Sequence, residues 1–249
     1  MTHEGRTTQA SSADGGDANM TKAQERPLSI GLRAARANLV PALVIQAAVV
    51  AVVLAYYFWE PARVWLGHLA EFKREGGYLF SLVAGVLAGG LLPELLTVAV
   101  FQRWHVRREN LSSLAFGACF WGLMALVVDL FYHLQALMFG SGVEFATVFK
   151  KTVIDQFVFT PFVTIPFTVV VFEWRHAGYR LGAVSRALGR DFYRRKVLPA
   201  VVSGLGFWLP VVVLVYCLPL PLQFPLFTLA LTLWVMIFTW ISHADKAAT

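Results

Sequence analysis

The sequence predicts an all-α protein, a polytopic integral membrane helical bundle of about six transmembrane helices with cytoplasmic N and C termini. Three observations predict this class: an apolar composition, six long apolar runs, and a one-sided distribution of Lys and Arg between them. Hydrophobic residues make up 57% of the 249 residues and charged residues 14%, against roughly 45–50% and about 25% in soluble domains. A soluble globule of this length cannot bury that much apolar surface. A soluble enzyme, a disordered tail and a disulfide-stapled secreted module are therefore excluded.

The apolar runs define one transmembrane domain, residues 31–249, which follows a polar arm, residues 1–30. The arm is rich in Gly, Ser, Thr and Asp, and it cannot bury enough surface to offset its ordering entropy, so we expect it to be disordered. A helix needs about 20 mainly apolar residues to cross a bilayer. The six runs near or above this length cover residues 39–59, 78–101, 111–139, 149–174, 197–217 and 226–242.

Lys and Arg residues lie mainly on one side of these runs. With six spans, 16 of them fall in the N-terminal arm, the loops after spans two and four, and the C-terminal tail, whereas five fall on the opposite side. Because Lys and Arg are enriched in cytoplasmic loops, we expect both termini in the cytoplasm. The net charge of +6 is thus attributed to membrane orientation, and nucleic acid is not an expected partner.

Three segments between the spans have patterns of their own. Glu60–Lys73 and Arg175–Lys196 mix apolar and charged residues, as helices in a membrane interface do. For Arg175–Lys196 an ordinary basic cytoplasmic loop is an equally good interpretation. Leu218–Pro225 contains three prolines, and we expect it to form a rigid, non-helical connection.

Span two places a carboxylate, Glu94, directly after Pro93. Proline removes a backbone hydrogen bond and kinks a helix, so Pro93 is a candidate hinge. Ionisable residues inside a span are costly and are functional candidates by default. Glu94 is either a pore or relay position, or a protonated side chain that is hydrogen-bonded to a neighbouring helix.

Small residues on spans two and three predict close helix contacts. Gly85 and Gly89 have the spacing that lets another helix approach. On span three, Ala125, Gly122 and Ala118 form a seam of small side chains that is suited to helix packing.

Spans three and four carry the other polar candidates, which are Asp129, His133, Lys151, Asp155 and Gln156. Asp129 and His133 are four residues apart and share a helix face, and so do Lys151 and Asp155, which can pair. In the six-span topology these side chains fall at similar depth towards the outer side, with Glu94 nearer the cytoplasm. This layout fits a polar outer vestibule on an aqueous pathway. It equally fits a salt-bridge cluster that fixes helix packing.

Pro161 in span four is a second candidate hinge. We expect no enzyme, no cofactor and no metal site, because the sequence has no phosphate loop, dinucleotide fingerprint or His-Glu-x-x-His motif. A metal site or an intramembrane enzyme built on Asp129 and His133 would need more polar residues than the spans supply. The expected partners are the lipid bilayer and small solutes or ions, and a homo-oligomer is an assembly that the sequence leaves open.

Residues Lys150–Pro161 read KKTVIDQFVFTP. This segment resembles the Mpv/PMP family of mitochondrial inner-membrane and peroxisomal membrane proteins, in which Lys-Lys, three apolar residues, Asp-Gln, four residues and Pro follow one another. LGRDF at 188–192, LPLQF at 220–224 and Trp-Ile-Ser at 240–242 are similar to later motifs of the family, in the same order. The chain departs from the family at Leu209-Pro210, which stand for its Trp-Pro, and in having six apolar runs where members are described with four spans.

The resemblance implies a weakly selective channel or pathway for small solutes or ions. Together with the charges in the spans, it predicts a polar pore lining made of Glu94, Asp129, His133, Lys151, Asp155 and Gln156. The acidic residues of the arm do not fit a transit peptide, so we expect a bacterial member in the plasma (inner) membrane. The alternative is a non-transporting membrane scaffold or stress-related accessory subunit whose buried polar residues are structural.

Overall fold

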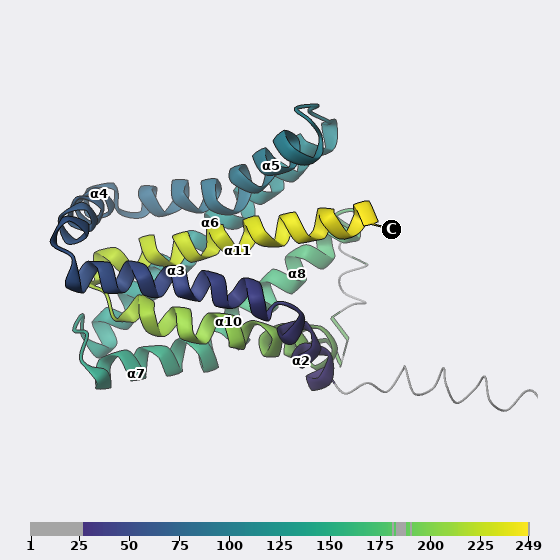
Figure 1. The fold of residues 1–249 in the computed structure, drawn as a ribbon. Coiled ribbons are helices and arrows are strands. Elements are labelled where there is room, and N and C mark those ends of the chain that lie inside the picture. Colours follow the sequence, from purple (N-terminus) through teal and green to yellow (C-terminus); the bar gives the residue numbers. More distant parts are fainter. Residues whose placement is uncertain (1–26, 181, 183–187, 190, 249) are drawn as a thin grey trace, which may run out of the picture.

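The structure is a computed structural model that describes residues 27–180, 182, 188–189 and 191–248. Within these ranges it is built of helices and contains no strand, which confirms the all-α class. The helices run back and forth in one bundle (Figure 1). Most of the arm that we expected to be disordered, residues 1–26, lies outside the described residues. Helix α2 (Pro27–Ala37) begins before the arm's expected end at residue 30.

The label η marks π-helical turns. In chain order after α2 the helical segments are α3 (Leu39–Phe58), α4 (Glu60–Gly85), η1 (Val86–Leu91), α5 (Leu92–Leu96), η2 (Thr97–Phe101), α6 (Arg108–Phe139), α7 (Phe145–Ile154), η3 (Asp155–Thr164), α8 (Ile165–His176), η4 (Tyr193–Val197), α10 (Leu198–Tyr216) and α11 (Leu220–Ala248).

Six continuous helical runs are long and apolar enough to span a membrane. They are Leu39–Phe58, Glu60–Phe101, Arg108–Phe139, Phe145–His176, Tyr193–Tyr216 and Leu220–Trp240. Each overlaps one predicted span, so the number of apolar helices is confirmed. The 32 residues of α6 extend about 48 Å at 1.5 Å per residue, which exceeds the roughly 30 Å of a bilayer's hydrocarbon core.

Helix α4 is two helices joined at Gly77. The backbone of Gly77 has φ 50° and ψ −131°, a conformation that residues with a Cβ rarely adopt. The half before Gly77 turns across one end of the bundle, where Figure 1 shows it nearly end-on. This is the geometry expected of the Glu60–Lys73 segment. The break also falls directly before Tyr78, the predicted start of span two.

The expected non-helical connection over Leu218–Pro225 is wrong for most of its length. Helix α11 begins at Leu220 and includes Pro221 and Pro225. Pro221 lies in the first turn, where the backbone N–H groups have no intrahelical partner, so its missing N–H costs little. Of the Arg175–Lys196 segment, residues 181, 183–187 and 190 lie outside the described residues, and its interfacial helix stays a prediction.

Both candidate hinge prolines lie at π-helical turns. Pro161 is inside η3, and Pro93 is the second residue of α5, directly after η1. Proline cannot donate to the regular i→i−4 ladder, and π-helical turns commonly mark such interruptions and functional sites. The sites of the two irregularities were therefore predictable, although their role as hinges remains a prediction.

The small residues of spans two and three face each other, as their spacing predicted. A Cβ on Gly85 would lie 2.3 Å from Ala125 Cβ, and one on Gly90 would lie 2.9 Å from the backbone N of Ala118. A Cβ on Gly122 would lie 2.9 Å from Leu82 Cδ1. The α4–η1 run and α6 are thus packed backbone against backbone, at a separation that only small residues permit.

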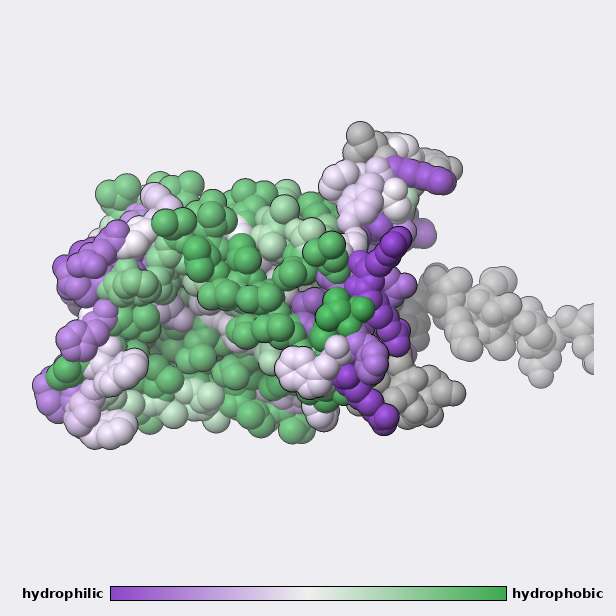
Figure 2. All heavy atoms as spheres, turned by 90° about the horizontal axis from the view of Figure 1, so that it is seen from above, coloured by the Kyte–Doolittle hydropathy of each residue, from purple (hydrophilic) through white to green (hydrophobic). Residues whose placement is uncertain are grey.

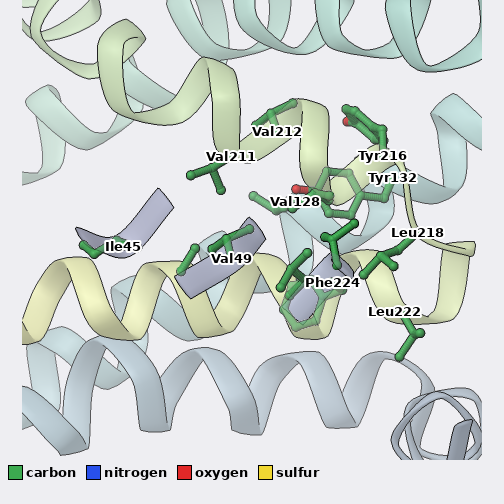
Figure 3. Close-up of a cluster of buried hydrophobic side chains, with 14 of the residues drawn as sticks. Ile45, Val49, Val128, Tyr132, Val211, Val212, Tyr216, Leu218, Leu222 and Phe224 are labelled. Carbon is green, nitrogen blue, oxygen red and sulfur yellow. The ribbon is translucent and has the colours of Figure 1, made fainter. Parts of the chain in front are cut away.

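The apolar core lies between α3, α6, α10 and α11. Figure 3 shows its central side chains pointing toward one another, namely Ile45, Val49, Val128, Tyr132, Val211, Val212, Tyr216, Leu218, Leu222 and Phe224. On the outside, hydrophobic residues cover the middle of the face seen in Figure 2 and hydrophilic residues gather at its two ends.

The two ends of the bundle differ in their connections. Helix α2, the turn after η2, the end of α8 and the C-terminus lie at one end, which we call the terminal end (Figure 1). The connections α3–α4, α6–α7 and α10–α11 lie at the opposite end. The even number of long helices places both described chain ends together, as the six-span topology requires.

Candidate functional site

The polar residues predicted on α6 and α7 lie at matched depth in the half of the bundle near the opposite end. Asp129 precedes the end of α6 by ten residues, and Asp155 follows the start of α7 by ten residues. At 1.5 Å per residue, each lies about 15 Å along its helix from that end. Their side chains nevertheless belong to two separate clusters.

The first cluster is a buried ion pair, the Lys73–Asp129 pair. Lys73 Nζ lies 2.9 Å from Asp129 Oδ2 and donates a further hydrogen bond of 3.1 Å to the carbonyl of Gly77. Ser81 Oγ donates to the same Asp129 oxygen at 2.6 Å. The side chains of Lys73 and Asp129 are 6% and 1% exposed. The break at Gly77 lets the helix fold back so that Lys73 reaches into the bundle.

An open pocket of about 450 Å³ lies against this ion pair. Its lining consists of Lys73, Arg74, Gly77, Tyr78, Asp129, His133, Leu220 and Pro221. His133 Nδ1 lies 2.8 Å from the backbone carbonyl of Asp129 and 3.5 Å from Asp129 Oδ1. The predicted Asp129–His133 neighbourhood is confirmed, although Asp129 has Lys73 as its main partner.

The second cluster surrounds Asp155 and is called the Asp155 cluster. Tyr216 Oη donates to Asp155 Oδ2 at 2.6 Å and accepts from Gln135 Nε2 at 2.6 Å. Gln156 Nε2 and Thr160 Oγ1 donate to Asp155 Oδ1 at 2.9 and 3.3 Å. Asp155 thus accepts three hydrogen bonds, and side chains from α6, η3 and α10 meet around it.

Four polar groups beside these hydrogen bonds have no partner within the described residues. They are Lys151 Nζ, Thr152 Oγ1, Gln156 Oε1 and Gln135 Oε1. The predicted Lys151–Asp155 pair is wrong, because Lys151 places its ammonium 5.8 Å from the centroid of the Tyr216 ring and forms no ion pair within the described chain. Buried polar groups are rarely left unpaired, and such groups usually bond ordered water or a ligand.

Tyr132 lies between the two clusters. Its ring packs edge-on against Tyr216 at 5.4 Å between centroids, and Tyr132 follows Asp129 by three residues on α6. The residue is 2% exposed. The polar groups therefore form a nearly continuous row from the pocket to Asp155.

Glu94 lies apart from both clusters, near the terminal end, as predicted. Asn110 Nδ2 donates to Glu94 Oε1 at 2.5 Å, and Asn110 Oδ1 accepts from the backbone N–H of Arg107 at 2.6 Å. Asn110 and Asp129 are 19 residues apart on α6, which is about 28 Å along the helix. Glu94 is therefore hydrogen-bonded to a neighbouring helix, one of its two predicted roles.

Aromatic rings gather where α6 contacts α8, at positions between Asn110 and Asp129 along α6. Phe116, Phe120 and Phe172 contact one another at centroid distances of 5.2 to 6.0 Å, and Phe167 stacks on Phe120 at 6.0 Å. Closer to Asp155, Phe131 stacks on Phe159 at 3.7 Å. The polar row ends at these rings and does not reach Glu94.

Sequence reasoning missed four members of the site. Lys73 was counted only as a loop charge, and Ser81, Gln135 and Tyr216 were passed over because single neutral polar residues are common in spans. The Gly76-Gly77 pair just after Lys73 was the signal for a chain reversal. No local signal marks Tyr216, because its role depends on the packing of α10 against η3.

No family model, no curated protein and no solved structure matches this chain. Six helices of the described chain are long and apolar enough to span a membrane, which fits a multi-pass membrane protein. The buried polar side chains named above, apart from Asn110, lie in the half of the bundle near the opposite end. Among the described residues no three His, Cys, Asp or Glu side chains come together as a metal site would require.

Proposed function

We propose that the chain is a multi-pass protein of a bacterial plasma membrane that provides a weakly selective pathway for small solutes or ions. The pathway enters at the pocket beside the Lys73–Asp129 pair and continues along Tyr132 to the Asp155 cluster. The single observation that carries this proposal is the set of four buried polar groups without partners in the described chain, on the helices α6, α7 and η3 near the Asp155 cluster.

The four groups support a hydrated interior because it would be costly to bury them without any hydrogen-bond partner. Each buried hydrogen-bonding group without a partner costs about 1–3 kcal/mol, and more if it is charged. A purely structural bundle gains nothing from four such groups at one place. Water or a polar solute in the site offsets this cost, since a buried water usually makes two to four hydrogen bonds to such groups.

The position of the family-like segment also supports the proposal. Lys151, Asp155, Gln156 and Pro161 of KKTVIDQFVFTP are all buried, and all face the Asp155 cluster or its helix irregularity. We therefore keep the proposal of a divergent Mpv/PMP member. The charges at the terminal end, from α2 through the loops to the tail, support cytoplasmic termini by the positive-inside rule.

In this proposal the described state is a closed one, because Phe120 and the rings around it lie between Asn110 and Asp129 along α6. Opening requires the η3 turn to move, and Pro161 inside this π-helical turn is the proposed hinge. Pro93, beside Glu94, is the corresponding hinge near the terminal end.

Reconstitution in liposomes tests the proposal. We expect the purified protein to release small solutes or to give single-channel currents, and we expect Asp155→Asn and Glu94→Gln to change the conductance or its selectivity. Asp191→Asn and Glu109→Gln are matched controls, because both carboxylates are on the surface of the bundle. Silence at all voltages, or conductance unaffected by the two core variants, would overturn the pathway.

The same variants distinguish this pathway from the alternative function, a non-transporting scaffold. A non-transporting scaffold predicts that Asp155→Asn lowers abundance and thermal stability, because Asp155 joins η3 to α10 through Tyr216, while no flux changes. The Lys73–Asp129 ion pair specifically supports this alternative, because it connects α4 to α6.

A further inference from the structure

We infer that the pocket beside the Lys73–Asp129 pair is a binding site for a small organic anion that carries a carboxylate or phosphate group. This goes beyond the proposed function, because the pocket can hold an anion whether or not the chain conducts. Its volume of about 450 Å³ lies within the range of small-molecule sites, which are clefts with a few convergent polar groups.

The charges around the pocket favour an anion. Three of its lining residues, Lys73, Arg74 and His133, carry or can carry positive charge, and one, Asp129, is acidic. The carboxylate of Asp129 is already engaged by Lys73 at 2.9 Å and Ser81 at 2.6 Å and is 1% exposed. A cation would therefore find no free carboxylate in the lining. Since the charge of Lys73 is itself compensated by Asp129, Arg74 is the lining cation that remains for an anion.

Arg74 is the cation that a ligand can recruit. Its guanidinium pairs with Glu71 at 3.0 Å, and the two side chains are 63% and 55% exposed. Such exposed pairs contribute about 0–1 kcal/mol. A carboxylate or phosphate can form two parallel hydrogen bonds with a guanidinium, and these charge-assisted bonds are about twice as strong as neutral ones. A ligand that offers two oxygens can therefore compete with Glu71 for the Arg74 guanidinium.

The backbone adds positive potential at the same place. Because α4 breaks at Gly77, a new helical run begins beside it at Tyr78, and α11 begins at Leu220. Both starts belong to the pocket lining. A helix N-terminus carries about half a positive charge, so two such ends reinforce the attraction of Arg74 and His133 for an anion.

The remaining walls define the rest of the ligand. The Tyr78 and His133 rings lie 5.8 Å apart between centroids, and Leu220 and Pro221 complete an apolar side. A short carbon chain or ring fits against these surfaces while its charged group faces Arg74. An anionic lipid headgroup and a free metabolite share this chemistry.

Calorimetric titration of the full chain in nanodiscs of neutral lipid tests the site, with butyrate and inorganic phosphate as probes. We expect saturable binding that Arg74→Gln and His133→Asn each weaken at least about tenfold, as expected for loss of a hydrogen bond to a charged group. Lys150→Gln is the control, because it removes an exposed positive charge near the same end but outside the pocket, and binding should persist.

A second arm identifies the source of the anion. If phosphatidylglycerol in the nanodisc competes with the probes in the wild type, a lipid headgroup occupies the site; if it does not, the site serves a soluble anion. The absence of saturable binding together with the absence of competition overturns the inference. So does equal binding by the wild type and the folded Arg74→Gln variant.

Discussion

Replacement of Asp129 by Asn should destabilise the protein strongly, because it leaves the buried ammonium of Lys73 without a counter-ion. The two side chains are 1% and 6% exposed, and their charged atoms lie 2.9 Å apart. Removal of one partner of a buried ion pair typically costs about 3–5 kcal/mol, mainly because the other charge stays buried. We therefore expect Asp129→Asn to lower the free energy of unfolding by about that amount.

Equilibrium unfolding in mixed micelles with increasing dodecyl sulfate, followed by tryptophan fluorescence, measures this difference. Glu71→Gln is the matched control, since its pair with Arg74 is exposed and such pairs contribute about 0–1 kcal/mol. Addition of Lys73→Met to Asp129→Asn should recover part of the stability, because it removes the uncompensated charge. A loss no larger than that of Glu71→Gln, or no recovery in the double variant, would refute this reasoning.

Three further predictions follow from the contacts. Gly85→Val should lower the free energy of unfolding by about 1–3 kcal/mol, because a Cβ there would lie 2.3 Å from Ala125 Cβ. Gly206→Ala, with nothing within 4 Å, should not lower the thermal unfolding midpoint, since alanine is the better helix former. Tyr216→Phe should cost about 1–3 kcal/mol in the same micelle titration, since the lost hydroxyl leaves two buried partners unsatisfied. Lys151→Met should reduce flux in liposomes and change the free energy of unfolding by less than about 1 kcal/mol, because water in the proposed pathway hydrates the ammonium, which has no hydrogen-bond partner within the described chain; unchanged flux would contradict this.

The fold was predictable from the sequence because its main determinants are local. Length and hydropathy define each apolar helix, and glycine and alanine spacing located the contact between the α4–η1 run and α6. Pro93 and Pro161 marked two of the π-helical turns, since an interior proline removes a backbone hydrogen bond. The connection over Leu218–Pro225 was mispredicted because Pro221 lies in the first turn of α11, where proline does not break a helix, and because Pro225 is accommodated inside that helix.

The site was predictable only in part, because partners depend on tertiary packing. The sequence identified Asp129 and Asp155 and their matched depth, but not which side chains reach them. The break in α4 at Gly77 places Lys73 beside Asp129, and the packing of α10 against η3 places Tyr216 beside Asp155. An i, i+4 spacing made Lys151 and Asp155 neighbours on a helix face, yet Asp155 accepts from Tyr216 and Gln156 and the Lys151 ammonium lies against the Tyr216 ring instead.

Aqueous access to the Asp155 cluster is the most direct test of a hydrated pathway. Gln156→Cys and Phe162→Cys, each in a background with Cys119 and Cys217 replaced by Ser, are compared in liposomes for reaction with a small cationic methanethiosulfonate. Gln156 is 2% exposed inside the bundle, whereas Phe162 is 65% exposed on its apolar outside. We predict that the cysteine at 156 reacts and the cysteine at 162, surrounded by lipid, does not. Reaction at 162 with none at 156 would contradict both the membrane placement and the hydrated core.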